Sequence, residues 1–323
     1  MSATGQEQTD VLGPPYTMRT LALRPDDEGE VVATLVTRRA EQPTRRAVLH
    51  VHGFADYFFQ TVAADWWVAQ GYDFYALDLR KYGRSLREHQ TANYVTDLTA
   101  YDEELALAYA AVTAEHDHVV MTAHSTGGLI VPLWLDRLRP REVVGVALNA
   151  PWLEMNNSLL VRTLGTRVID VVGAVDPLRV IPRTVTGMYA RSMHHEHDGE
   201  WDFDLRWKPL ESFEVHAGWL RAIRRAHARL HRGLDLRMPV LVQSSARSAQ
   251  EATLADAQSA DIVLDVEQIR RWTPALGRHV TLAQTEGATH DVTLSPEPVR
   301  TEVFRELERW HTAYVDEAVV RGR

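Results

Sequence analysis

The stretch MTAHSTGGLI, residues 121–130, places Ser125 between an apolar run and two glycines. Ala123, Ser125 and Gly127 fit the pattern G-x-S-x-G with alanine at the first position. This pattern marks a tight strand-to-helix turn that exposes a nucleophilic serine, and only small residues fit two positions before and after it. Ser125 could therefore attack an acyl carbon, or it could simply cap the helix that follows.

A serine nucleophile needs a base, and His290 has the best position along the chain. It stands in EGATHDVTLS, residues 286–295, just past the last apolar run and in a context typical of a loop. His124 precedes the serine directly, but neighbouring side chains on a strand diverge, which makes it a poor base. The chain order serine, acid, histidine also favours His290.

The acid that orients this histidine should lie between the serine and the histidine. The segment QSADIVLDVEQ, residues 258–268, offers Asp261 and Asp265, and Asp256 lies slightly earlier. Asp265 has the position of a helix N-terminal residue. We therefore expect Asp261 to be the acid, with Asp265 as the alternative.

An oxyanion hole is expected from the segment HVHGF, residues 50–54, which ends an earlier apolar run. Gly53 would let the backbone approach the serine closely. We expect the backbone N–H groups of Phe54 and Thr126 to hold the negative oxygen. The alternative is that His52 and Gly53 simply close a strand.

The elements that must position these residues alternate along the chain. Apolar runs of strand length, rich in β-branched or aromatic residues, cover 46–54, 72–79, 118–125, 143–151, 238–245 and 279–287, and an earlier strand pair fits 18–38. Apolar positions at three- and four-residue spacing predict helices in 61–71, 97–115, 127–138, 265–277 and 296–320. This alternation predicts a parallel sheet flanked by helices.

The alternation stops between residues 152 and 235, where arginine, tryptophan and histidine accumulate. Patterns in 159–175 and 216–234 predict amphipathic helices, whereas 193–207 is typical of a loop. The expected organisation is a flexible N-terminus of residues 1–15, an α/β core of residues 16–151 and 236–323, and a helical cap, or lid, of residues 152–235.

Composition excludes several classes of protein. The 323 residues, 45% hydrophobic, suffice for one large domain with an insertion. A net charge of −9 would repel phosphate backbones, so nucleic acid is a poor partner. Without cysteine, disulfides, thiolate zinc sites and a cysteine nucleophile are excluded. The sequence shows no secretory signal and no integral membrane segment, which predicts a cytoplasmic protein.

With HGF, DLRKYGRS, AHSTGG, SAD and GATHD in this order, the chain resembles the α/β-hydrolase superfamily, over residues 18 to 320. Within it, the chain is similar to lysophospholipase-like and monoacylglycerol-lipase-like serine ester hydrolases. The resemblance implies a mostly parallel eight-stranded sheet flanked by helices, with a helical cap inserted after the sixth strand. It also implies a carboxylic ester hydrolase that needs no metal or organic cofactor.

Residue by residue, the resemblance implies Ser125 as nucleophile, His290 as base and Asp261 as orienting acid. Two departures stand out. Alanine replaces the common glycine two residues before the serine, and some seventeen residues separate Ser244 from Asp261 where the family usually needs only a few.

The cap is expected to cover the serine and to select a small-molecule ester substrate. The expected pocket residues are His52, His124, Trp152, Leu159 and Trp219, and the aromatic and aliphatic ones among them suit an alkyl or acyl chain. An anionic head group could meet one of the cap arginines 162, 167, 183 and 191. Some enzymes that the chain resembles cleave monoalkyl phthalates such as mono(2-ethylhexyl) phthalate. The expected substrate is thus a small to medium monoester, either monoacylglycerol-like or a phthalate monoester.

Other functions stay open at this point. The same residues could serve a thioesterase, an amidase or peptidase, or a carbon–carbon bond hydrolase, and the fold also hosts non-catalytic ligand-binding proteins. The run HHEH, residues 194–197, contains good zinc ligands but lacks the helical i, i+4 spacing of a metalloprotease, so we expect no metal there. Monomer and homodimer are equally compatible with the sequence.

Overall fold

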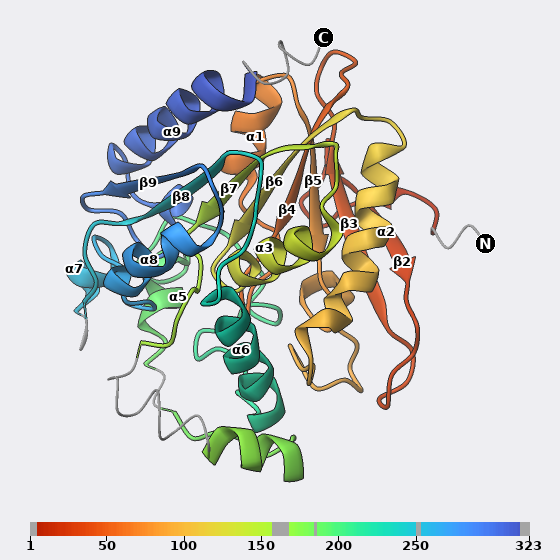
Figure 1. Ribbon diagram of the computed structural model, residues 1–323, viewed down its shortest axis with the longest axis vertical. Helices are drawn as coiled ribbons and strands as arrows, with labels where there is room; N and C mark the ends of the chain where they lie inside the picture. Colours follow the sequence, from red (N-terminus) through yellow and green to blue (C-terminus); the bar gives the residue numbers. More distant parts are fainter. Residues whose placement is uncertain (1–4, 157–167, 184–185, 250–252, 317–323) are drawn as a thin grey trace.

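A nine-stranded sheet forms the centre of this computed structural model, which describes residues 5–156, 168–183, 186–249 and 253–316 (Figure 1). The strand order is β1-β2-β3-β5-β4-β6-β7-β8-β9, antiparallel from β1 to β5 and parallel from β5 to β9. The strands are Gln8–Thr9, Thr17–Ala22, Val32–Arg38, Arg46–Val51, Asp73–Asp78, His118–His124, Val143–Asn149, Val240–Ser245 and Val280–Thr285. The predicted α/β fold with a mostly parallel sheet is confirmed.

The sheet starts earlier in the chain than predicted, because β1 adds a ninth strand that pairs with β2. Directly after β1, Asp10 is only 4% exposed and accepts hydrogen bonds of 2.6 and 2.8 Å from the Arg84 guanidinium. Arg84 also donates to Asp78 at 2.9 Å, so this buried cation is shared by two carboxylates. Residues 8–10 are thus part of the packed sheet, which corrects the flexible segment expected up to residue 15.

Helices cover both faces of the sheet. One face carries α1 and α9, whose side chains form an apolar cluster with the strands. The other face carries α2, α3 and α8, which contribute to the largest apolar cluster. The helix bounds are α1 Thr61–Ala69, α2 Asp102–Thr113, α3 Gly127–Leu138, α5 Met188–Met193, α6 Ala217–Leu230, α7 Leu254–Ala257, α8 Val266–Trp272 and α9 Val299–Trp310.

The segment expected to be a cap leaves the sheet after β7 and returns to it at β8. Its described parts include a helix over 168–175 together with α5 and α6, and they lie at one end of the sheet in Figure 1. The insertion follows the strand predicted to be the sixth, which is the seventh when β1 is counted. Leu159 lies outside the described residues.

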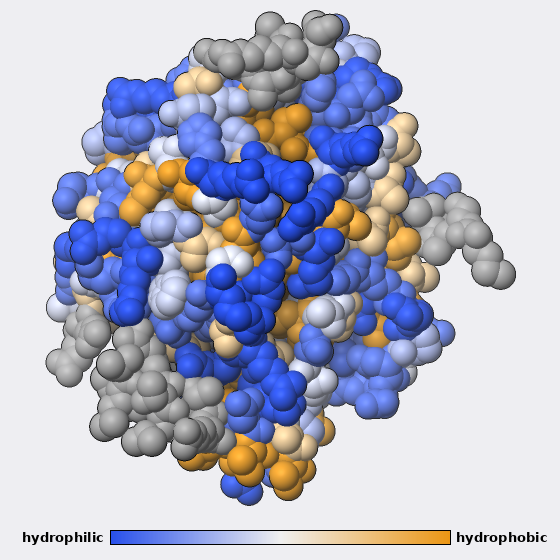
Figure 2. Space-filling view, viewed as in Figure 1, coloured by the Kyte–Doolittle hydropathy of each residue, from blue (hydrophilic) through white to orange (hydrophobic). Residues whose placement is uncertain are grey.

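The visible surface is mostly hydrophilic, with an apolar patch at its lower end (Figure 2). Among the described residues, exposed large apolar side chains concentrate in residues 168–180 of the expected cap, at Val168, Val171, Val175, Leu178 and Val180. Within the described residues, no helix has the length and apolar content needed to cross a membrane.

Candidate active site

Ser125 occupies a strained turn between β6 and α3. Its φ angle is +50°, in the left-handed region that a non-glycine residue adopts only when its surroundings impose it. The Ser125 N–H donates to the carbonyl of Asn149 at 3.0 Å, and its carbonyl accepts from Gly128 and Trp152 at 2.9 Å each. These bonds from the neighbouring strand end and the following helix hold the serine in place.

Of the two small residues around Ser125, Gly127 leaves no room for a side chain, whereas position 123 has room for a methyl group. A Cβ atom on Gly127 would lie 2.5 Å from the carbonyl oxygens of both Val51 and His52, so α3 can begin here only with glycine. Ala123 is fully buried in β6, between β4 and β7, and its methyl group is part of the apolar core. Alanine therefore satisfies the elbow pattern at this position.

The structure brings Ser125, His290 and Asp261 into one hydrogen-bonded chain. His290 Nε2 lies 3.1 Å from the Ser125 Oγ, and His290 Nδ1 lies 2.8 Å from the Asp261 Oδ2. The other oxygen of Asp261 accepts N–H groups of Val263 at 2.8 Å and Leu264 at 2.7 Å. Because a carboxylate only accepts hydrogen bonds, Nδ1 carries the proton and Nε2 is free to accept one from the serine hydroxyl.

The two other candidate acids, Asp265 and Asp256, cap helices. Asp265 is the N-cap of α8 and accepts the Glu267 N–H at 3.0 Å. Asp256 forms a capping box with Thr253 at the start of α7. Of the three aspartates, Asp261 is therefore the one that lies against His290.

The long segment between β8 and Asp261 is accommodated as an excursion that closes on itself. The Asp261 N–H donates to the Arg247 carbonyl, and the Ala249 N–H donates to the Asp261 carbonyl, both at 3.0 Å. These bonds place Asp261 beside the end of β8, where an acid with a much shorter spacing from the strand would lie. The unusual spacing seen in the sequence thus leaves the position of the carboxylate unchanged.

Two backbone N–H groups lie beside the serine with no acceptor among the described residues, those of Phe54 and Thr126. A Cβ atom on Gly53 would be 3.0 Å from the Ser125 Cβ, which shows how closely the loop between β4 and α1 approaches the serine. Phe54 follows Gly53 and Thr126 follows Ser125, so both amides lie next to this contact between the loop and the elbow. They can donate to an oxygen bound there.

His52 supports this loop and does not line a pocket. It is 1% exposed, its Nδ1–H donates to the Gly53 carbonyl at 2.8 Å, and its Nε2 accepts the Leu79 N–H at 3.1 Å. Because the peptide group is planar, fixing the Gly53 carbonyl also fixes the direction of the Phe54 N–H. The expected substrate contact of His52 is corrected accordingly, since both ring nitrogens are already bonded to backbone.

Two aromatic rings flank His290. The His124 ring lies 4.8 Å away and the Tyr189 ring 5.4 Å away, centroid to centroid. His124 donates from Nδ1 to the Asn149 carbonyl at 3.2 Å, and burial lowers its pKa, which favours the neutral ring. Burial raises the pKa of the Tyr189 hydroxyl. Tyr189 belongs to α5, and no sequence pattern marked it as a neighbour of His290.

An aromatic wall begins at Phe54. Its ring lies 4.3 Å from that of Trp219, which in turn lies 5.8 Å from Trp152. Trp219 is 2% exposed and Trp152 is partly buried. Trp152 and Trp219, two of the three cap residues expected to contact the substrate, thus lie together beside the Phe54 ring.

The guanidinium of Arg183 lies over the Phe54 ring, 5.7 Å from its centroid. It donates to the Ser212 hydroxyl at 3.0 Å and to the Phe213 carbonyl, and it pairs with no carboxylate in the described part of the chain. Burial lowers its pKa. Of the other cap arginines, 191 lies 3.9 Å from a carboxylate, and 162 and 167 lie outside the described residues.

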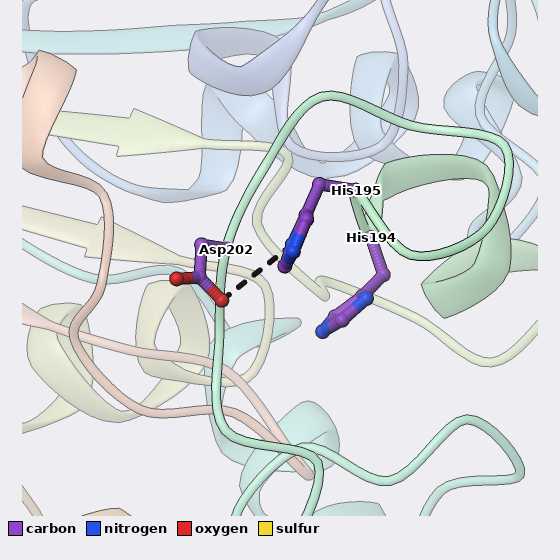
Figure 3. A group of neighbouring side chains, drawn as sticks. All are labelled: His194, His195 and Asp202. Carbon is purple, nitrogen blue, oxygen red and sulfur yellow. Dashed lines mark ion pairs between the residues drawn. The ribbon is translucent and has the colours of Figure 1, made fainter.

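The histidine-rich loop of the cap gathers His194, His195 and Asp202 (Figure 3). His194 Nε2–H donates to the Phe203 carbonyl at 3.1 Å, and its Nδ1 accepts the Glu196 N–H at 3.2 Å. Backbone groups therefore use both ring nitrogens of His194. The exposed pair of His195 and Asp202, 3.6 Å apart, remains as two ligands, too few for a tetrahedral zinc site.

Sequence reasoning also missed the support of the His290 loop by Asp291. Its Oδ1 accepts the Asn149 amide at 2.6 Å and the Thr293 N–H at 3.1 Å, and Gln60 donates to its Oδ2 at 3.3 Å. The carboxylate thus ties the loop after β9 to the end of β7. The dipeptide His290-Asp291 was visible in the sequence, but its partner Asn149 carried no signal.

Comparison with known proteins adds the family. Residues 42–297 match the family described as serine aminopeptidase, S33. No curated protein matches the sequence.

Among solved structures, a soluble variant of the monoglyceride lipase from Saccharomyces cerevisiae, in complex with a substrate analog, gives a TM-score of 0.64 at 16% identity, covering 90% of this chain and 94% of that chain. Monoacylglycerol lipase from Paleococcus ferrophilus gives 0.62 at 17% identity over 85% and 97%. A thermostable carboxyl esterase from Bacillus coagulans gives 0.64 at 12% identity over 92% and 99%. These similarities concern the fold. Since the family match spans well over half of the sequence, this chain belongs to the serine aminopeptidase S33 family and has the α/β-hydrolase fold inferred from its motifs.

Proposed function

We propose that this protein is a serine hydrolase that cleaves carboxylic esters through an acyl-enzyme. The observation that carries the proposal is the hydrogen-bonded chain from Asp261 through His290 to Ser125, at a serine held with a positive φ. Structural turns seldom combine a strained serine with a buried histidine and carboxylate. Together they provide a nucleophile, a base and an orienting group.

The mechanism follows from these groups. Ser125 Oγ attacks the ester carbonyl carbon while His290 Nε2 takes the hydroxyl proton, and Asp261 stabilises the imidazolium that forms. The N–H groups of Phe54 and Thr126 donate to the resulting oxyanion. When the C–O bond of the ester breaks, the proton on Nε2 passes to the departing alcohol. A water molecule then attacks the acyl-serine with the same proton transfers, releasing the acid and restoring Ser125.

The substrate we propose is a small to medium monoester. The wall of Phe54, Trp219 and Trp152 supports an alkyl or acyl chain beside the reacting carbonyl. Arg183, an exposed guanidinium without a carboxylate partner in the described residues, favours a substrate with a free carboxylate, such as a monoalkyl phthalate. A monoacylglycerol-like ester, whose head group is neutral, would leave this cation unused.

A peptidase is the second candidate, because the family is described by an aminopeptidase. An aminopeptidase must accept the N-terminal ammonium group of its substrate. The guanidinium of Arg183 on the Phe54 ring would repel that group, which favours the ester hydrolase.

Hydrolysis assays separate these possibilities. The substrates are p-nitrophenyl esters from acetate to palmitate, mono(2-ethylhexyl) phthalate, a monoacylglycerol and amino-acid p-nitroanilides. We expect turnover of short to medium esters and of the phthalate monoester, with little cleavage of the anilides. Preferential cleavage of the anilides would instead identify a peptidase.

A further inference from the structure

Lysine is rare in this chain, with only Lys81 and Lys208 among 35 basic residues. Both are buried, at 2% and 5% exposure, although lysine usually lies at the surface. Lys81 pairs with Asp26 and Glu28 near the turn between β2 and β3. Lys208, by contrast, comes from the cap and reaches the loop that holds the proposed oxyanion hole.

The ammonium group of Lys208 lies 2.9 Å from Asp56 Oδ1, and these side chains are only 7% and 2% exposed. Three aromatic rings surround the ammonium at 5.4 to 5.9 Å, those of Phe59, Tyr189 and Phe203. Burial alone would raise the pKa of the Asp56 carboxyl, but the charge of Lys208 holds that pKa below its usual range. The Asp56 carboxyl is therefore ionised, and both side chains are largely shielded from water.

Asp56 acts on the turn that presents Phe54. Its Oδ2 accepts the Gly53 N–H at 3.4 Å. Ala55, between Phe54 and Asp56, has a φ of +48°, which is unfavourable for any residue with a Cβ atom. The Ala55 N–H donates to Asn93 at 3.1 Å. A strained turn of this kind persists only while such contacts hold it.

We propose that Lys208 is a positioning residue of the oxyanion hole, acting through Asp56 on the turn of residues 53–56. Its ammonium anchors the Asp56 carboxylate, the carboxylate holds the Gly53 N–H, and the turn directs the Phe54 N–H at the reacting oxygen. The cap thus contributes to catalysis as well as to substrate binding. This role rests on the proposed ester hydrolysis.

A lost anchor affects the transition state more than the bound ester, because the negative oxygen exists only in the former. Removing one oxyanion donor from a serine hydrolase lowers kcat about 100- to 1,000-fold, and a displaced donor should cost somewhat less. For Lys208→Met, which keeps the length of the side chain without its charge, we expect kcat on p-nitrophenyl butyrate to fall about 10- to 100-fold. KM should change less than about twofold.

Affinity for a trifluoromethyl ketone provides the decisive second readout. Ser125 Oγ adds to the ketone carbon, the serine proton moves to His290, and the carbonyl oxygen becomes an oxyanion in the hole. In Lys208→Met we expect the inhibition constant of the ketone to rise by the same factor by which kcat/KM falls. Lys81→Met, which removes the other buried lysine, is the matched control and should keep kcat within about twofold even where its melting temperature falls.

Stability and catalysis are separated by a second variant, because a lone buried Asp56 charge is costly. Asp56→Asn combined with Lys208→Met removes both charges and should fold, with kcat still reduced at least tenfold. Wild-type kcat in either folded variant, or a lower kcat with unchanged ketone affinity, would overturn the role of Lys208. Absence of ester turnover in the wild-type protein would instead overturn the proposed function.

Discussion

The Oδ2 atom of Asp261 lies 2.8 Å from Nδ1 of His290, whereas Asp265, four residues further along, caps helix α8. Asp261→Asn should therefore lower kcat about 10,000-fold, because an amide that donates to Nδ1 favours the wrong imidazole tautomer. Asp265→Asn should keep kcat within about twofold and cost about 1 kcal/mol of stability or less. Ester kinetics and urea unfolding of both variants check this, and the opposite ranking would transfer the acid to Asp265.

The turn from β6 to α3 makes different demands on two small residues, Gly127 at the start of α3 and Ala123 near the end of β6. Gly127→Ala should destabilise the protein by about 3 kcal/mol, because the added methyl group meets two carbonyl oxygens at 2.5 Å. Ala123→Gly restores the more common elbow residue and should cost only about 0.5–1 kcal/mol, with activity retained. Soluble yield, urea unfolding and kcat measure both effects. Wild-type stability of Gly127→Ala would contradict the described contact between α3 and the end of β4.

Arg183 should discriminate between substrates. Because its guanidinium lacks a carboxylate partner among the described residues, Arg183→Gln should raise KM for mono(2-ethylhexyl) phthalate about 10- to 100-fold, the loss of one charged hydrogen bond. KM for p-nitrophenyl butyrate should change less than about twofold. Arg191→Gln, at an arginine that lies near Asp198, is the matched control. An equal change for both substrates would show that Arg183 does not recognise the carboxylate.

A buried histidine at the base of the cap predicts a pH dependence of stability. Burial lowers the pKa of His227 from 6.5 to about 3, and its Nε2–H donates to the Trp152 carbonyl at 2.9 Å. Between these two pH values the unfolded chain binds a proton that the folded chain does not. Stability is therefore lost as pH falls below 6.5, by about 1.4 kcal/mol per pH unit from this residue.

His227→Gln removes that contribution. Its free energy of unfolding should fall less than that of the wild type between pH 7 and pH 5, by about 2 kcal/mol. Urea unfolding at both pH values gives the difference directly, and other buried histidines cancel in the comparison. Parallel pH curves for the two proteins would indicate that His227 is protonated in the folded state.

Local patterns predicted much of this molecule. Windows of about ten residues were enough to recognise the apolar strand runs, the small residues around Ser125 and the loop position of His290. Each of these features depends on residues that are near one another in the sequence. The order of these motifs was enough to infer the α/β-hydrolase superfamily, which the family match over residues 42–297 and the similar solved structures support.

The acid could not be decided from the sequence, because its position depends on a distant hydrogen bond. Asp261 is held beside β8 by the carbonyl of Arg247, across an excursion that the sequence presents only as unusual length. The placement of the N-terminal strand β1 also depends on a distant contact, since Asp10 is held by Arg84, 74 residues away. The ion pair of Asp56 and Lys208 likewise joins the core to the cap.

An acyl-enzyme on Ser125 can be detected directly by mass spectrometry of the intact protein. Wild-type protein and Ser125→Ala are incubated with p-nitrophenyl butyrate, quenched in acid and weighed, alongside labelling by a fluorophosphonate. We expect a butyryl adduct and full labelling in the wild type, and neither in Ser125→Ala. An adduct that persists in Ser125→Ala, or folded wild-type protein that neither reacts with the probe nor hydrolyses the ester, would contradict this expectation.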